Sequence, residues 1–142
     1  MFCLSAVVVS AQAPKSYRAR LSPVALDVAM QSTVSGSGTV TAVLTGTKLT
    51  VNGTFDGLKS PATIAQIHKS PIAGVRGPVM ADLSVSSGPE GPAGTSGTIS
   101  GTLTLTPLQA ADLEKKRLYV QLHSEKAPDG NLWGWLMPDA KR

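Results

Sequence analysis

The chain has 142 residues, a formal net charge of +4 and 42% hydrophobic residues, while 15% of its residues are charged and 4% are aromatic. This length predicts one domain, and the hydrophobic content is high enough for a buried core, which excludes an intrinsically disordered chain. The scarcity of charged residues and the 14 glycines and 10 prolines argue against a helical bundle. The dispersed basic residues argue against a nucleic-acid partner.

The first segment, Met1 to Ala13, carries no charge and contains an apolar run followed by small residues. The run is too short to span a bilayer, and the small residues around Ala11 are typical of a signal-peptidase site. We therefore predict a signal peptide over residues 1–11, without the usual basic start, and secretion to the periplasm or the extracellular space. Its removal would discard Cys3, the only cysteine. A buried first strand is the alternative interpretation.

From residue 15 onward, apolar and polar residues alternate, which predicts half-buried β-strands. The predicted strands are residues 16–21, 24–30, 38–45, 48–56, 62–68, 78–85, 97–106, 117–123 and 131–137. Thr45-Gly46-Thr47 predicts a hairpin, and Ser70-Pro71 and Gly77-Pro78 predict breaks between strands. Many short alternating strands predict an all-β antiparallel sandwich or barrel, and we expect the sandwich.

One short helix is predicted near residues 106–115. Thr106 can cap its first turn, Pro107 occupies the first helical position, and Gln109 can complete a capping box. Leu108, Ala111 and Leu113 supply a short apolar face. We expect this helix to cover the open end of the β-sandwich.

Both histidines end a predicted strand, in the similar segments Gln66-Ile67-His68 and Gln121-Leu122-His123. Alternation places Gln66 with His68 on one face, and Tyr119, Gln121 and His123 together on one face. The two imidazoles can therefore converge if the strands are neighbours.

Two interpretations of the histidines remain open. Imidazole is a common ligand of zinc and copper, but a tight site needs three or four ligands, so a glutamine, Tyr119, Glu125 or Asp129 would have to complete it. In the structural alternative, each imidazole hydrogen-bonds a backbone carbonyl group and fastens a loop to the strand end.

Five segments, in this order, resemble the CHRD (chordin-type) domain over residues 16–138. They are Phe55-Asp56-Gly57-Leu58, Ala65-Gln66-Ile67-His68, Gly74-x-x-Gly77-Pro78-Val79, Ser96-Gly97-Thr98-Ile99, and Leu118-Tyr119-Val120-Gln121-Leu122-His123 with Pro128-x-Gly130-x-Leu132-x-Gly134 after it. The resemblance implies a β-sandwich of immunoglobulin-like or Cu,Zn superoxide dismutase-like Greek-key topology. It also implies an extracellular or periplasmic setting and no established enzymatic activity.

The chain departs from this family pattern in two places. Gln66 stands where the family typically has the first histidine of His-Ile-His, which removes one potential metal ligand. Trp133 and Trp135 stand where the family usually has arginine and glutamine. They alternate with Leu132, Gly134 and Leu136, so they form an exposed aromatic pair if the leucine face is inside, and are core residues otherwise.

Three functions remain. We prefer a secreted, non-enzymatic binding or structural module that contacts an envelope or extracellular protein or a glycan, or associates with itself. Its candidate binding residues are Gln66, Tyr119, Gln121, Trp133 and Trp135. The alternative is a copper- or zinc-binding protein with a superoxide-dismutase-like site formed by His68 and His123. The third and least favoured function is a hydrolase that uses Ser70 or Ser124 beside an imidazole. Adjacent residues of a strand point to opposite faces, which keeps a serine away from a neighbouring histidine.

Overall fold

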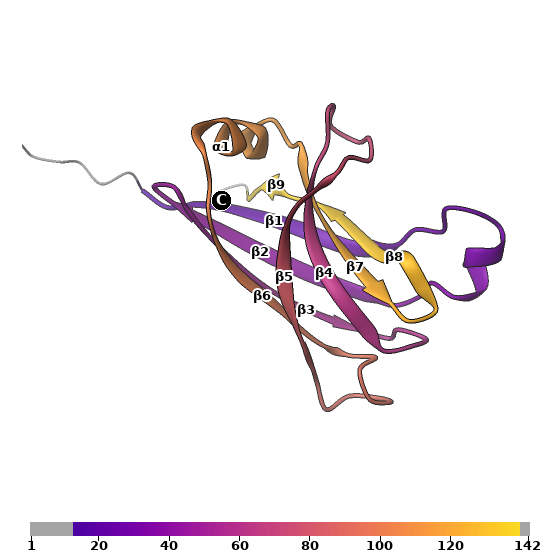
Figure 1. Cartoon of the computed structure of the whole chain (residues 1–142). Coiled ribbons are helices and arrows are strands. Elements are labelled where there is room, and N and C mark those ends of the chain that lie inside the picture. Colours follow the sequence, from indigo (N-terminus) through magenta and orange to yellow (C-terminus); the bar gives the residue numbers. More distant parts are fainter. Residues whose placement is uncertain (1–12, 140–142) are drawn as a thin grey trace, which may run out of the picture.

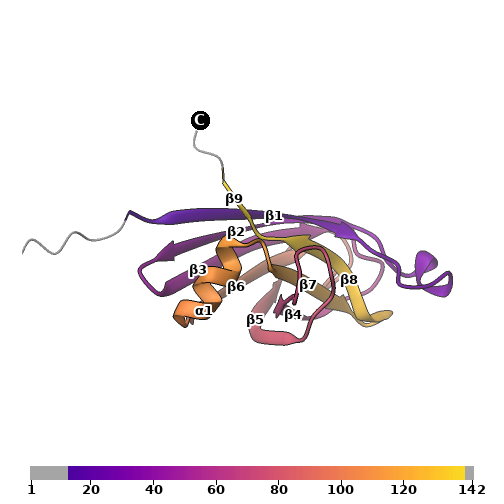
Figure 2. The ribbon, with the colours of Figure 1, turned by 90° about the horizontal axis from the view of Figure 1, so that it is seen from above.

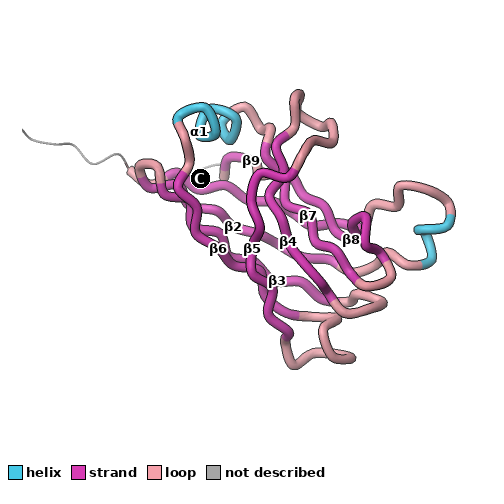
Figure 3. The backbone as a smooth tube through the Cα atoms, viewed as in Figure 1, coloured by secondary structure: helices cyan, strands magenta, loops and turns pink. Residues whose placement is uncertain are grey.

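The computed structural model describes residues 13–139 of the chain. The predicted signal peptide, with Cys3, lies outside these residues. The described part contains antiparallel strands, one 3₁₀ turn and one short α-helix (Figures 1 and 3). The strands are β1 (Lys15–Pro23), β2 (Ser37–Thr45), β3 (Lys48–Asp56), β4 (Ala62–Lys69), β5 (Val79–Ser87), β6 (Gly97–Thr104), β7 (Leu118–Ser124), β8 (Ala127–Trp135) and the short β9 (Met137–Pro138).

Eight strands close into a barrel in the order β1-β2-β3-β6-β5-β4-β7-β8, and β8 returns to β1. In this order β6 lies beside β3, and β7 lies beside β4, so the chain follows a Greek-key path. The all-β antiparallel fold with one short helix is thus confirmed. The strands do not form a clear sandwich of two separate sheets, because β1 and β5 each pair with strands of both halves.

Two strands join what would be the two sheets of a sandwich. β5 pairs with β4 over residues 79–83 and with β6 over residues 84–87. β1 pairs with β2 along most of its length and with β8 at Ser22 and Pro23. Glycine permits the close approach at the β1–β8 contact, since a Cβ atom on Gly134 would lie 2.5 Å from the Arg20 carbonyl oxygen. Barrel closure therefore depends on backbone contacts between residues far apart in the sequence.

The predicted alternation fills the inside of the barrel. Aliphatic side chains from every long strand are buried there, among them Ala19, Leu21, Val40, Ala42, Leu49, Val51, Ala65, Ile67, Leu83, Ile99, Val120, Leu122 and Leu132. Burying each large aliphatic side chain contributes about 1.5–3 kcal/mol. The barrel is held together by this core, and its polar alternate positions face outward.

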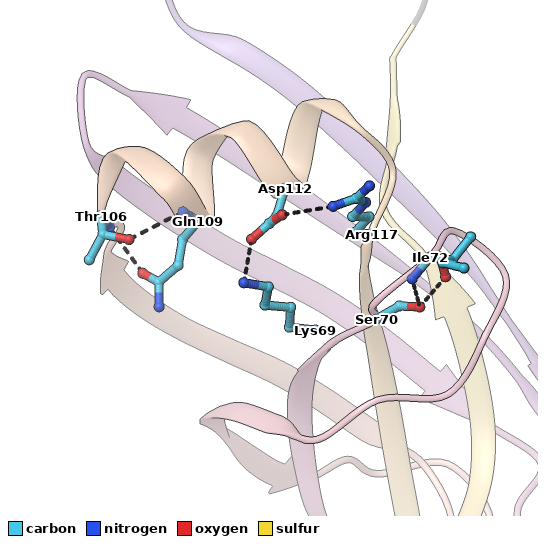
Figure 4. Close-up of polar contacts among 7 residues, drawn as sticks. All are labelled: Lys69, Ser70, Ile72, Thr106, Gln109, Asp112 and Arg117. Carbon is cyan, nitrogen blue, oxygen red and sulfur yellow. Dashed lines mark hydrogen bonds and ion pairs between the residues drawn. The ribbon is translucent and has the colours of Figure 1, made fainter.

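The helix α1 (Pro107–Glu114) lies across one end of the barrel (Figures 1 and 2). Its predicted start is confirmed: the Thr106 hydroxyl accepts from the Gln109 amide, and the Gln109 side chain accepts from the Thr106 amide. Figure 4 also shows the buried Asp112 carboxylate between Lys69 and Arg117, which ties α1 to the end of β4. Leu113 enters the core, but the expected contribution of Leu108 is wrong, since this side chain is 64% exposed.

The predicted strand at residues 24–30 is also wrong. This segment forms turns that lead into a 3₁₀ turn at Ala29–Ser32. The Asp27 carboxylate accepts from the Met30 amide at 2.9 Å, and Val28 is 81% exposed. A short acidic side chain that bonds its own backbone favours a turn over a strand.

Candidate functional site

The outer surface of β4, β7 and β8 brings together the residues that the sequence singled out. We call this surface the aromatic face; it consists of Gln66, His68, Tyr119, Gln121, His123, Trp133 and Trp135. β4 and β7 are neighbours, with His68 opposite Tyr119 and Gln66 opposite Gln121. In the β7–β8 pair, Tyr119 lies opposite Trp135 and Gln121 opposite Trp133. The two histidines therefore share a face, but His68 lies opposite Tyr119, four positions along β7 from His123, so the two residues stand near opposite ends of that face.

The leucine side of β8 faces the core. Leu132 and Leu136 are fully buried, and Gly134 lies against β1. The two tryptophans therefore lie on the outer surface, as one of the two open interpretations required. Both are only partly exposed, because their rings pack against neighbours on the aromatic face.

Aromatic rings form a continuous stack on this face. Tyr119 is stacked on His68 with ring centroids 4.9 Å apart, and on Trp133 at 5.6 Å. The Trp135 ring is tilted against Tyr119 at 4.6 Å, and the Arg76 guanidinium lies 4.6 Å from the centre of the Trp133 ring. Pairs of this kind contribute about 0.5–1.5 kcal/mol beyond area burial. Tyr119, which is almost fully buried, is the centre of the stack.

The loop between β4 and β5, residues 70–78, is fastened to the aromatic face by Gly77. The Tyr119 hydroxyl accepts from the Gly77 amide at 3.0 Å and donates to its carbonyl at 3.1 Å. The His68 Nδ1–H donates to the same carbonyl at 2.9 Å. Sequence reasoning identified this segment as a break between strands and as one of the segments that resemble the CHRD domain, but it missed Arg76 and Gly77 as part of the site.

A bulge in β8 covers the other end of the aromatic face. The register between β7 and β8 shifts between Leu122 and Ser124, so residues 128–131 bulge. His123 Nδ1–H donates to the Pro128 carbonyl at 2.7 Å, and the Gln121 amide donates to the Asp129 carbonyl at 2.7 Å. Gly130, with φ of +124°, lies directly over the Gln121 amide, where a side chain would not fit. Both imidazoles therefore fasten backbone segments, as the structural interpretation expected.

Four buried polar atoms of the aromatic face have no hydrogen-bond partner among the described residues. They are His68 Nε2, Gln121 Oε1, His123 Nε2 and Trp133 Nε1. Because Nδ1 of each imidazole donates to a carbonyl oxygen, Nε2 of the neutral ring carries a lone pair. These four atoms, three acceptors and one donor, lie covered from solvent beside the stacked rings.

The candidates for completing a metal site are mostly engaged elsewhere. Tyr119 bonds Gly77, and Gln66 donates to the Asp82 carboxylate at 2.9 Å. Glu125 and Asp129 lie exposed. Within residues 13–139, no three or more His, Cys, Asp or Glu side chains form a group that could hold a metal ion. A complete superoxide-dismutase-like site is therefore not present there.

The two serines considered for a hydrolytic pair are also engaged. The Ser70 hydroxyl donates to the Ile72 carbonyl (Figure 4), and the Ser124 hydroxyl accepts from the Asn131 amide at 3.0 Å. Neither hydroxyl is hydrogen-bonded to an imidazole in the part of the chain that the structure describes. The geometry gives no support to the serine–histidine hypothesis.

Burial lowers the pKa of His68 below its usual value of 6.5, and the charges of His123 and Arg76 act in the same direction. The hydrogen bond to Gly77 opposes this shift but is the smaller effect. The folded protein therefore favours the neutral imidazole, the form that leaves Nε2 free to accept.

This shift predicts a loss of stability in mild acid. The unfolded chain takes up the His68 proton near pH 6.5, before the folded chain does, so the free energy of unfolding should fall as the pH drops below about 6.5 and be level above it. We expect His68→Gln to lack this part of the pH dependence. Urea unfolding at about pH 7.5 and about pH 5.5 measures it. If the free energy of unfolding changes by the same amount between these two pH values in the wild type and in His68→Gln, the assignment to His68 is contradicted.

Within the described residues, no helix has the length and hydrophobicity that crossing a bilayer requires. The model of the CHRD domain family matches residues 17–136, nearly the whole described chain. No curated protein and no solved structure matches the chain.

Proposed function

Because this chain belongs to the CHRD domain family, we propose that it is an extracellular binding module whose ligand contacts the aromatic face. The family suggests a binding or structural role outside the cell, and the two departures from the family pattern, at Gln66 and at Trp133 and Trp135, lie on the aromatic face. No enzymatic step is part of the proposal.

The observation that carries the proposal is the group of four buried polar atoms without partners on one surface. Leaving a buried donor or acceptor unsatisfied costs about 1–3 kcal/mol. Such costs are usually retained where function requires them. A ligand that displaces the loop at residues 70–78 or the β8 bulge would hydrogen-bond to these atoms and remove the cost. The partly exposed rings of Trp133 and Trp135 would supply apolar contact area.

The chemistry of the face suits a ligand rich in hydroxyl groups. A hydroxyl both donates and accepts, so it can pair with the Nε2 atoms, with Gln121 Oε1 and with the Trp133 indole N–H. Sugar rings also stack on indole surfaces. We therefore favour a glycan of the cell envelope or matrix as the ligand. An envelope protein or a second copy of the chain is the other possible result of the binding test.

The tryptophan variants test this proposal. Trp133→Ala and Trp135→Ala should each weaken binding by about 30-fold or more, because buried tryptophans at binding surfaces typically contribute over 2 kcal/mol. Binding to a panel of envelope glycans, and self-association by analytical ultracentrifugation, measure the effect. Leu108→Ala is the matched control, since this exposed side chain lies on α1, away from the face. Retained binding in both tryptophan variants, with the fold intact, would refute the proposal.

A second candidate function is copper or zinc binding by His68 and His123. This candidate is supported by the hydrogen bonding of the two imidazoles. Each donates its Nδ1–H to a backbone carbonyl group and leaves Nε2 without a partner. Histidines that bind metals are typically oriented by such a hydrogen bond. Gln121, which lies between Tyr119 and His123 along β7, has a third acceptor without a partner, its Oε1. Oxygen and imidazole nitrogen together suit zinc or Cu(II).

Metal titration separates this candidate from the first. If the histidines bind metal, each chain should bind about one zinc or copper ion, and the affinity should fall as the pH drops and the imidazoles become protonated. Both His68→Ala and His123→Ala should lose this binding. Gln66→Ala serves as the control, because its amide is bonded to Asp82. If the wild-type protein binds neither metal in isothermal titration, the histidines only position the loops.

A further inference from the structure

The two ends of the barrel carry opposite charge. We define the helix end as residues 13–18, 45–48, 69–79, 105–118 and 136–139, and the hairpin end as residues 22–37, 55–62, 87–97 and 124–131. The helix end holds eight Lys and Arg and three Asp and Glu, a net charge of +5. The hairpin end holds two basic and five acidic residues, a net charge of −3. The overall net charge is small, but the charges are distributed unequally between the two ends of the barrel.

The cations of the helix end differ in how far they are neutralised. Lys69 and Arg117 pair with the buried Asp112 (Figure 4), and Lys15 pairs with Glu114. Within the described part of the chain, Lys48, Lys115 and Lys116 take part in no ion pair, and all three lie exposed. The helix end thus keeps free positive charge on its surface.

Exposed aliphatic side chains lie at the same end. Ile72 and Val75 project from the loop between β4 and β5 and are 64% and 49% exposed. Val79, Leu108 and Met137 are also exposed there. In Figure 1 this loop, α1 and β9 lie along one side of the molecule, whereas the β7–β8 hairpin lies on the other. The hairpin at Thr45–Lys48 brings Lys48 to the helix end.

We propose that the helix end docks on the surface of an anionic lipid bilayer. Ile72 and Val75 enter the headgroup region, and the surrounding lysines contact lipid phosphates. Apolar contact together with basic residues is the combination that holds peripheral proteins on anionic membranes. The acidic hairpin end is repelled, so the barrel is oriented with α1 towards the lipid. The aromatic face lies on the side of the barrel and stays free for its own ligand.

Co-sedimentation with vesicles tests this proposal. The wild-type chain should bind vesicles of equal parts phosphatidylcholine and phosphatidylglycerol, and should be released by high salt and bind phosphatidylcholine alone only weakly. The double variant Lys115→Glu/Lys116→Glu should partition at least about 25-fold less, since each lysine near an anionic surface contributes about fivefold. Ile72→Ser/Val75→Ser should partition about tenfold less.

The controls are matched variants at the hairpin end. Lys59→Glu/Lys126→Glu changes the net charge by the same amount, and Val28→Ser removes an exposed aliphatic side chain. All variants carry the same N-terminal segment, so differences among them do not arise from it. The proposal fails if the wild type does not bind anionic vesicles, if either helix-end variant binds as the wild type does, or if the charge control loses as much. Binding to a single-stranded oligonucleotide but not to vesicles also overturns it.

Discussion

Gly77→Ala is expected to lower the free energy of unfolding by about 2–4 kcal/mol and to release the loop between β4 and β5. A Cβ atom at this position would lie 1.8 Å from the Lys69 carbonyl oxygen, a backbone atom that cannot move aside alone. The loop would shift, and the hydrogen bonds of Gly77 to Tyr119 and His68 would be lost. Urea unfolding followed by circular dichroism measures the change.

Gly74→Ala in the same loop is the control for this result. Gly74 has φ of +88°, but a Cβ atom there meets nothing within 4 Å, so only backbone strain of about 1 kcal/mol is expected. If Gly77→Ala costs no more than Gly74→Ala, the close contact with Lys69 is not a constraint. The loop would then be free to leave the aromatic face.

Tyr119→Ala should have the largest effect of any substitution on the aromatic face, about 3–5 kcal/mol of unfolding free energy. The side chain is 1% exposed and contacts His68, Trp133 and Trp135. Its removal opens a cavity under both tryptophans, so their fluorescence should shift to longer wavelength. Both tryptophans of the chain lie on this face, which makes the signal specific to it.

Tyr119→Phe separates the ring from the hydroxyl. The stack is kept, and only the two hydrogen bonds to Gly77 are lost, so the cost should be about 1–2 kcal/mol with little change in tryptophan fluorescence. A Tyr119→Phe variant as unstable as Tyr119→Ala would show that the hydroxyl, rather than the rings, holds the face together.

Local signals in the sequence predicted most elements of the fold. The start of α1 followed from Thr106, Pro107 and Gln109, because capping depends on residues three positions apart. The strand at residues 24–30 was predicted wrongly because Val24, Leu26 and Val28 alternate, although Asp27 turns the chain. Closure into a barrel depends on contacts such as that of Gly134 with Arg20, and no periodicity within a strand reports such a contact.

The aromatic face was predictable in part, because the residues of one strand that share a face follow from local alternation. Alternation placed the histidines and glutamines correctly relative to their strands, and the register then brought them together. It could not decide the orientation of β8, because Leu132 and Trp133 are both apolar and each fits a core. Arg76, Gly77 and the Pro128 carbonyl were missed, since their positions follow from loop paths and a bulge.

The most direct test of the account is the response of the two indole N–H resonances to ligand in a nitrogen-15 NMR spectrum of the labelled chain. The chain contains two tryptophans, both on the aromatic face, and the Trp133 N–H has no partner among the described residues. We predict that a bound envelope glycan, or a second copy of the chain, shifts the Trp133 resonance in proportion to occupancy. A ligand that saturates the protein while both indole resonances remain unchanged would contradict the assignment of the aromatic face as the binding surface.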